Sequence, residues 1–101
     1  MDIRELTEEM HRFVKTKGWY ENDSRRPQTM QNLAISLVLE ASEVLEHFQW
    51  QEAARNPQGL ANELADVALY LLQIASIAGI DLEEAILSKL NENYDRSWED
   101  E

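Results

Sequence analysis

One segment of the sequence, residues 64–80, is apolar around nearly its whole circumference when it is drawn as a helix. Asp66 is the only charged residue in it. A helix that is apolar on every side is normally buried, so other helices have to cover it. We therefore expect an all-α fold.

Helix-breaking residues are few and clustered, and they divide the chain into four expected helices: Asp2–Thr16, Thr29–Gln49, Leu60–Ala78 and Asp81–Trp98. Gly18 and Gly79 are expected to end the first and third helices. Thr29 and Asp81 are expected to cap the second and fourth helices. Residues 18–28 contain Gly, Asn, Asp, Ser and Pro together, which predicts a loop there.

The charge balance excludes several kinds of partner for a chain that we expect to form one domain, residues 1–101. Asp and Glu number 20 against 9 Lys and Arg, a net charge of −11. Such a surface repels phosphate backbones and anionic lipids, so we expect no nucleic-acid or membrane partner. The absence of cysteine removes disulfides, thiolate zinc sites and thiol nucleophiles. The first residues lack a signal-peptide pattern, so a cytoplasmic location is expected.

The acids of the second and third expected helices lie among apolar residues. Glu40, Glu43 and His47 fall in a narrow arc of the second helix with apolar residues on both sides. On the third helix, Glu63 lies one turn before Asp66. Unpaired buried carboxylates are costly, and neither helix contains Lys or Arg. The missing positive charge is therefore expected to be a bound cation.

Carboxylates are hard oxygen ligands of the type that suits Mg²⁺ or Mn²⁺. The predicted metal ligands are Glu40, Glu43, Glu63 and Asp66. Two other interpretations stay open from the residues alone. One is a non-catalytic acidic helical module that binds basic partners. The other is a di-metal carboxylate bundle that activates oxygen, but such a bundle needs Glu-x-x-His on two helices and the sequence has one match, Glu8–His11.

The acid pairs, Glu40-Ala41-Ser42-Glu43 and Glu63-Leu64-Ala65-Asp66, resemble the motifs of the MazG-like all-α nucleoside triphosphate pyrophosphohydrolases. The resemblance covers most of the chain and is greatest to the compact members similar to dCTP pyrophosphatase. The other matching segments are Asn32-Leu33-Ala34, Glu46–Trp50, Gly79-Ile80-Asp81 and the set Lys89, Asn93, Arg96. Leu39 stands where the family's fuller motif has one more Glu.

The resemblance implies a four-helix MazG-like bundle that assembles as a homo-oligomer, a dimer or a tetramer. It also implies Mg²⁺-dependent hydrolysis of a (d)NTP between the α and β phosphates, which yields the (d)NMP and pyrophosphate. Such an enzyme would serve nucleotide-pool house-cleaning. Water would be the nucleophile, and Glu43 is the predicted catalytic base.

The predicted substrate-binding residues are Lys89, Asn93, Arg96, Trp50, His47, Trp19 and Asn32. Lys89 and Arg96 lie on one face of the fourth helix, and with the family pattern they are expected to contact phosphates. Arg25 and Arg26, in the long loop, are further candidates for such a contact.

Trp19 and Trp50 offer flat rings on which a nucleobase can stack, and Trp50 is expected to line the same cleft as the acids. His47 is expected to support the acids or to contact the substrate, and a structural role for it stays open. The third helix has apolar residues on more sides than one chain of this size can cover. This surface also indicates self-association.

Overall fold

The computed structural model describes residues 1–97, and within them the chain forms four α-helices and no strand. The helices are α1 (Ile3–Thr16), α2 (Met30–Glu46), α3 (Pro57–Ile77) and α4 (Leu82–Asp95). The all-α prediction is therefore confirmed. The fourth helix ends at Asp95, and Trp98, its expected end, lies outside the described residues.

Both predicted glycine stops and both predicted caps are confirmed. Gly18 and Gly79 have left-handed backbone, with φ of 74° and 73°, which glycine adopts without a steric cost. Thr29 and Asp81 each accept a hydrogen bond from the backbone N–H three residues further on, at 3.1 Å. The residues at these helix ends therefore determine locally where the helices begin and stop.

Two further helix boundaries differ from the prediction, at the connection between α2 and α3. The second helix ends at Glu46 rather than at Gln49. The third begins at Pro57 rather than at Leu60, because the side chain of Asn56 caps it. Proline is tolerated in a first helical turn, where its missing N–H would have no partner. Residues 57–59, which the prediction left outside the helix, therefore form the first turn of α3.

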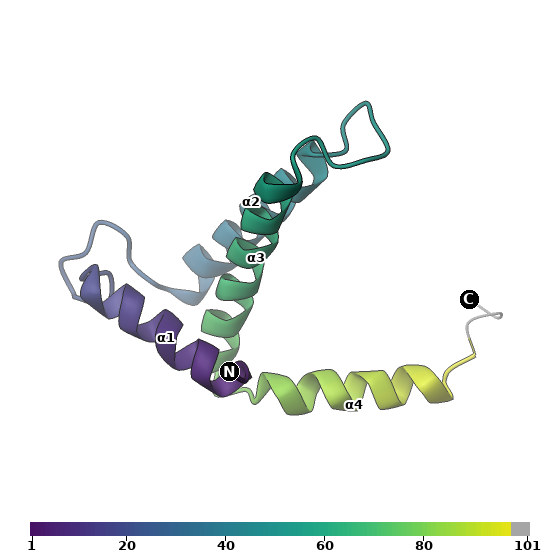
Figure 1. Ribbon diagram of the computed structural model, residues 1–101. Coiled ribbons are helices and arrows are strands. Elements are labelled where there is room, and N and C mark those ends of the chain that lie inside the picture. The colour runs from purple at the N-terminus through teal and green to yellow at the C-terminus, as the bar shows by residue number, and fades with distance from the viewer. Residues whose placement is uncertain (98–101) are drawn as a thin grey trace.

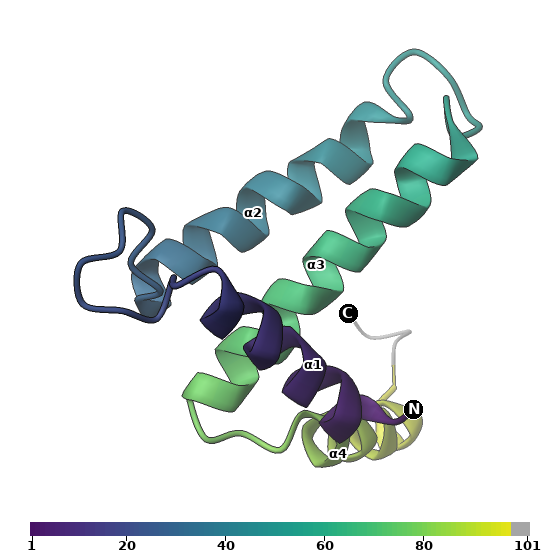
Figure 2. The ribbon, with the colours of Figure 1, turned by 60° about the vertical axis from the view of Figure 1, so that its left-hand side comes forward.

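α2 and α3 form an antiparallel pair, and α1 packs across the C-terminal half of α3 (Figures 1 and 2). The core lies where these three helices meet. Its buried apolar side chains are Met10, Val14, Leu33, Leu72 and Ala75. The other half of the α2–α3 pair carries the acids and contributes no buried apolar side chain among residues 1–97.

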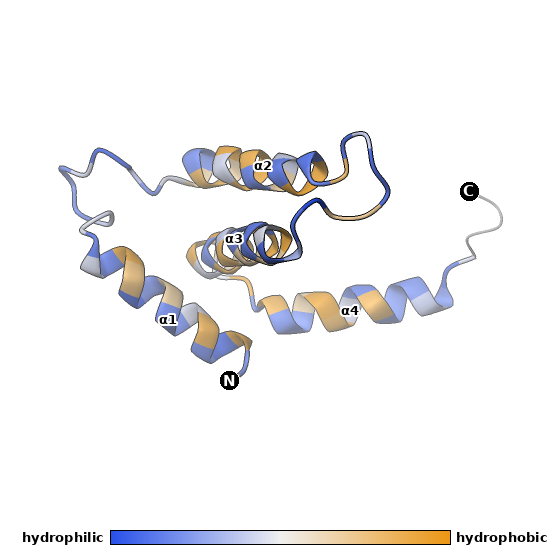
Figure 3. Cartoon of the chain, turned by 45° about the horizontal axis from the view of Figure 1, so that its top comes forward, coloured by the Kyte–Doolittle hydropathy of each residue, from blue (hydrophilic) through white to orange (hydrophobic). Residues whose placement is uncertain are grey.

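α4 follows a short turn and extends away from the other helices (Figure 1). It packs mainly against the end of α3, and no side chain within Leu82–Asp95 is buried. Its apolar residues lie along its length in Figure 3, and Ile86, Leu87 and Leu90 are about half exposed. The radius of gyration is 16.3 Å, against about 13 Å for a compact domain of this length. The described part of a single chain is therefore more extended than a compact domain of this length.

α3 is long and apolar enough to cross a membrane by length and composition, with a mean hydropathy of 1.3 in its most apolar window. The core helix of a soluble protein passes the same test. α3 also carries Glu63 and Asp66 and packs against both α1 and α2. The absence of a membrane partner stays a prediction.

Candidate active site

The two acid pairs face the same region between α2 and α3. Glu40 is half-buried, and its Oε2 atom is fully buried without a hydrogen-bond partner. Burial raises the pKa of Glu40, and hydrogen bonding to the Glu43 side chain and the negative charges of Glu43, Asp66 and Glu63 raise it further. The antiparallel pairing thus brings the four predicted ligands into one electrostatic cluster, which we call the acid cluster.

His47 is the C-terminal cap of α2 and lies against α3 at two points. Its Nε2 atom is hydrogen-bonded to the Oε2 atom of Glu63, while its Nδ1 atom is buried without a partner. A Cβ atom added at Gly59 would lie 3.0 Å from the His47 ring. Gly59 therefore leaves the space in which this ring sits, and the ring holds one carboxylate of the acid cluster in place.

The acid cluster fits Mg²⁺ or Mn²⁺ by the chemistry of its donors. It offers hard carboxylate oxygens from two helices, and the buried oxygen of Glu40 lacks a partner that a cation would supply. With the side chains as they stand, no three His, Asp or Glu side chains of the described residues are grouped closely enough to hold one ion. Coordination by the predicted set therefore requires side-chain movement, and the set stays a prediction.

A cavity of about 770 Å³ lies beside the acid cluster, between α1, α2, α3 and the loop that precedes α2. Asp66 belongs both to the acid cluster and to the wall of this cavity. The predicted residues Trp19 and Asn32 line it as well, and so do Arg25 and Arg26. The cavity thus joins carboxylate, cationic and aromatic groups, the combination that a metal-bound anionic nucleotide would need.

The loop side of the cavity is held by specific contacts. The Trp19 ring packs edge-on against Phe13 at 5.5 Å between centroids, and the Arg26 guanidinium lies 4.9 Å from the centre of the same ring. The side-chain amide of Asn32 donates a hydrogen bond to the carbonyl of Pro27 at 2.9 Å. These contacts hold a flat ring and a cation next to each other on one wall.

Other predicted site residues lie elsewhere. Trp50 is 92% exposed, has a left-handed φ of 72° and does not line the cavity of the single chain, so its place in a nucleotide site stays a prediction. That expectation assumed that α2 continues to Gln49, whereas the chain leaves the helix after Glu46. Figure 1 shows α4 extending away from the α2–α3 pair. It carries the predicted substrate-binding residues Lys89 and Asn93, and Arg96 follows its last residue, Asp95. Lys89 pairs with Glu92 at 3.5 Å.

Sequence reasoning missed Tyr70 and Gln73, which also line the cavity. They follow Asp66 by four and seven residues, and this spacing puts all three on one face of α3. Gln73 is a polar residue in an apolar helix and is only 3% exposed. Its position among apolar neighbours was the signal that could have drawn attention to it.

The fold and the site define an all-α protein in which two antiparallel helices present opposed carboxylates beside a cationic and aromatic cavity. The profile of the MazG-like family matches residues 35–101, which include both acid pairs and α4. The chain belongs to the MazG-like family, and the resemblance read from the acid motifs is confirmed.

Individual relatives agree with this assignment. dCTP pyrophosphatase 1 from Homo sapiens is 36% identical over 104 residues and that from Rattus norvegicus is 35% identical over 104 residues. Both alignments cover 94% of this chain and 56% of the relative, so the chain spans about half the length of the curated relatives it matches. The crystal structure of a pyrophosphatase from Archaeoglobus fulgidus has a TM-score of 0.75 and 32% identity, over 89% of this chain and 86% of that one.

Proposed function

We propose that this chain hydrolyses a (d)NTP between the α and β phosphates and releases the (d)NMP and pyrophosphate. The reaction depends on Mg²⁺, with Mn²⁺ as an alternative ion. Deoxynucleotides are the proposed substrate class, because the curated relatives are dCTP pyrophosphatases. The enzyme would act in nucleotide-pool house-cleaning in the cytoplasm.

One observation carries the proposal. The Oε2 atom of Glu40 is buried without a partner in the field of Glu43, Glu63 and Asp66, and Asp66 opens onto the cavity that Arg25 lines. Glu40 and the three carboxylates around its buried oxygen atom repel one another unless a cation joins them. A cavity beside such a cluster, with cations on its far wall, suits a polyphosphate that arrives with its own divalent ion.

The residues of the acid cluster have separate roles in this proposal. When bound, Mg²⁺ supplies positive charge that polarises a phosphoryl oxygen and makes water easier to deprotonate. Glu40, Glu43, Glu63 and Asp66 would hold the ion. Glu43 is exposed, and it accepts the proton of the attacking water. His47 keeps the Glu63 carboxylate oriented through their hydrogen bond.

The cavity would bind the rest of the nucleotide. Arg25 and Arg26 present guanidinium groups that can hold phosphate oxygens in a bidentate manner. The Trp19 ring offers a stacking surface for the base. Asn32 stabilises the end of the loop at Pro27, next to this wall, through its hydrogen bond to the Pro27 carbonyl.

We also propose that the working enzyme is a homo-oligomer, a dimer or a tetramer. The support is the apolar surface that one chain leaves exposed, on α4 and also at Val38 and Leu39 of α2, which are 67% and 60% exposed. Because α4 extends away from the cavity of its own chain, Lys89 and Arg96 would contact a nucleotide held by another copy (Figure 1). The exposed ring of Trp50 would reach a nucleotide in the same way.

The test is incubation of the protein with each (d)NTP in turn, with Mg²⁺, with Mn²⁺ and with a chelator. We expect pyrophosphate and the monophosphate to appear together, and only when the metal ion is present. Orthophosphate as the first product would contradict cleavage between the α and β phosphates. No hydrolysis of any nucleotide would favour the non-catalytic acidic module instead.

A further inference from the structure

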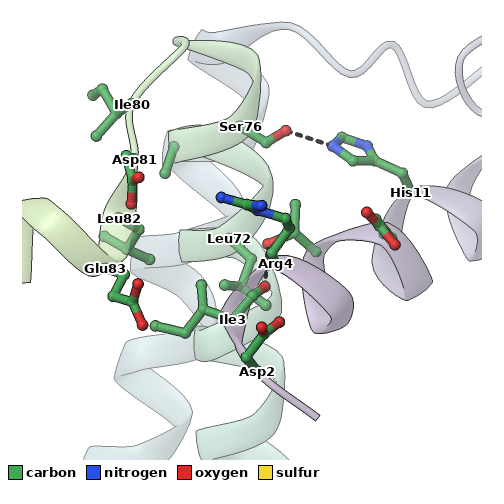
Figure 4. A pocket seen from close by; sticks show the side chains of 13 residues that line it. Asp2, Ile3, Arg4, His11, Leu72, Ser76, Ile80, Asp81, Leu82 and Glu83 are labelled. Carbon is green, nitrogen blue, oxygen red and sulfur yellow. Dashed lines mark hydrogen bonds between the residues drawn. The ribbon is translucent and has the colours of Figure 1, made fainter.

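Five polar side chains form one hydrogen-bond network on the side of the cavity away from the acid cluster. Gln73 of α3 donates from its amide nitrogen to Gln28 Oε1 at 2.8 Å and to the Tyr20 hydroxyl at 3.2 Å. The Tyr20 hydroxyl lies 2.6 Å from His11 Nδ1, and His11 Nε2 lies 2.7 Å from Ser76 Oγ. Figure 4 shows this last contact, which joins α1 to α3. The network therefore connects three parts of the molecule: α1, α3 and the loop that precedes α2.

The partners of each atom define the direction of these hydrogen bonds. Since the Tyr20 oxygen accepts from Gln73, its own proton is free to be donated to His11 Nδ1. The other ring nitrogen of His11 then carries a proton and donates it to Ser76. Burial lowers the pKa of His11, which favours the neutral ring that this arrangement requires. Every donor named here has an acceptor.

This hydrogen-bond network holds the loop that forms one wall of the cavity. Tyr20 follows Trp19 directly, and Gln28 is near the other end of the loop that carries Arg25 and Arg26. Gln73, 3% exposed, is the one buried polar residue of the described core and bonds to both ends of that loop. A buried amide that lost these partners would pay a desolvation cost, so the loop is held closely to α3.

We propose that Gln73, Tyr20 and His11 are positioning residues that fasten residues 18–28 to α3 and α1 and so hold the cationic and aromatic wall in place for the triphosphate. This role rests on the proposed function. None of the three is a ligand of the acid cluster. Loss of this hydrogen-bond network should therefore weaken nucleotide binding and leave the chemical step unchanged.

The experiment compares Tyr20→Phe with Tyr94→Phe, a matched control on α4 whose ring is 85% exposed. Tyr20→Phe removes both part-buried hydrogen bonds of the Tyr20 hydroxyl, which should raise KM for the best (d)NTP about tenfold and leave kcat within about twofold. Amide hydrogen exchange across residues 18–28 should become faster. Tyr94→Phe should match the wild type in both measurements.

Gln73→Met provides a second variant that removes both donors and keeps the side-chain volume similar. Gln73 and Tyr20 belong to the same hydrogen-bond network. The double variant, Tyr20→Phe with Gln73→Met, should therefore raise KM by less than the product of the two single effects. An active Tyr20→Phe protein with unchanged KM and unchanged loop exchange would overturn the positioning role alone. So would a Tyr20→Phe protein that is less stable but keeps its KM. A wild-type protein that hydrolyses no (d)NTP would overturn the proposed function, and this role with it.

Discussion

Polar atoms are buried between α2 and α3, whereas apolar side chains are exposed along α4. Glu40 Oε2 and His47 Nδ1 have no hydrogen-bond partner although both are buried. Leu87 and Leu90 are 55% and 48% exposed although both are large and apolar. Each arrangement costs free energy in an isolated chain. The two regions therefore differ in what they lack, which is a positive charge in the first and an apolar surface in the second.

This difference separates the two parts of the proposed function. A cation between α2 and α3 would act within one chain, so substitutions there should change activity at any protein concentration. A second copy of the chain against α4 would act between chains, so substitutions there should have effects that depend on concentration.

The largest effect is expected for Asp66→Asn, which removes a carboxylate shared by the acid cluster and the cavity. Hydrolysis should fall by more than about 100-fold, because a ligand should matter at least as much as its supporting residues. Helix content, measured by circular dichroism, should stay the same. Glu84→Gln is the matched control, an exposed acid on α4, and should retain wild-type turnover. Equal losses in both variants would show that the acid cluster is not the site.

Leu33→Ala and Leu90→Ala test the difference in burial directly. Leu33 is 2% exposed, and its truncation should lower the free energy of unfolding by about 3 kcal/mol at any protein concentration. Leu90→Ala should have little effect in dilute protein and a larger one in concentrated protein, where wild-type chains associate. Denaturant melts at two concentrations measure both. A Leu90→Ala effect that does not change with concentration would argue against a second copy on α4.

Gly59→Ala should have a smaller effect, confined to the acid cluster. The new methyl group would lie 3.0 Å from the His47 ring, so the ring has to move away and loosen its hydrogen bond to Glu63. We expect activity to fall about tenfold, the lower end of the range for residues that orient metal ligands. Asn62→Ala, at an exposed position of α3, is the control and should keep full activity. Unchanged activity in Gly59→Ala would remove His47 from the proposed mechanism.

The smallest effect is a pH dependence in the metal-free protein. Since the pKa of Glu40 is raised above its ordinary value of 4.5 in the folded state, the folded protein holds that proton more tightly than the unfolded chain. This contribution to stability is fully present below pH 4.5 and is lost as the pH rises through the folded value. With a chelator present, Glu40→Gln should therefore melt at a higher temperature than the wild type at neutral pH. The difference should shrink towards acid pH, and a lower melting temperature at neutral pH would contradict the prediction.

Features that depend on neighbouring residues could be predicted from the sequence. The glycine stops at Gly18 and Gly79 and the caps at Thr29 and Asp81 follow from local backbone chemistry. The facing of the acid pairs follows from periodicity on two helices that a short connection makes antiparallel. The start of α3 at Pro57 was missed because the same residues serve in a turn and in a first helical turn.

Features that depend on distant residues could not be predicted in the same way. The direction of α4 depends on the turn at Gly79 and on the contacts of α4 with the end of α3. Helical periodicity within α4 does not specify either of them. The exposure of Trp50 follows from the earlier end of α2. The hydrogen bonds of Gln73 join it to Gln28 and Tyr20, which are far from it in the sequence. Periodicity could indicate that Gln73 is unusual, but it could not name its partners.

The central claim is that carboxylates from α2 and α3 together bind the divalent cation that hydrolysis requires. Calorimetric titration of Mg²⁺ into wild type, Asp66→Asn and Glu84→Gln, each with a non-hydrolysable triphosphate analogue, tests it most directly. We predict that wild type and Glu84→Gln bind Mg²⁺ alike and that Asp66→Asn binds at least about tenfold more weakly. Equal binding by all three proteins, or none by the wild type, would contradict the claim.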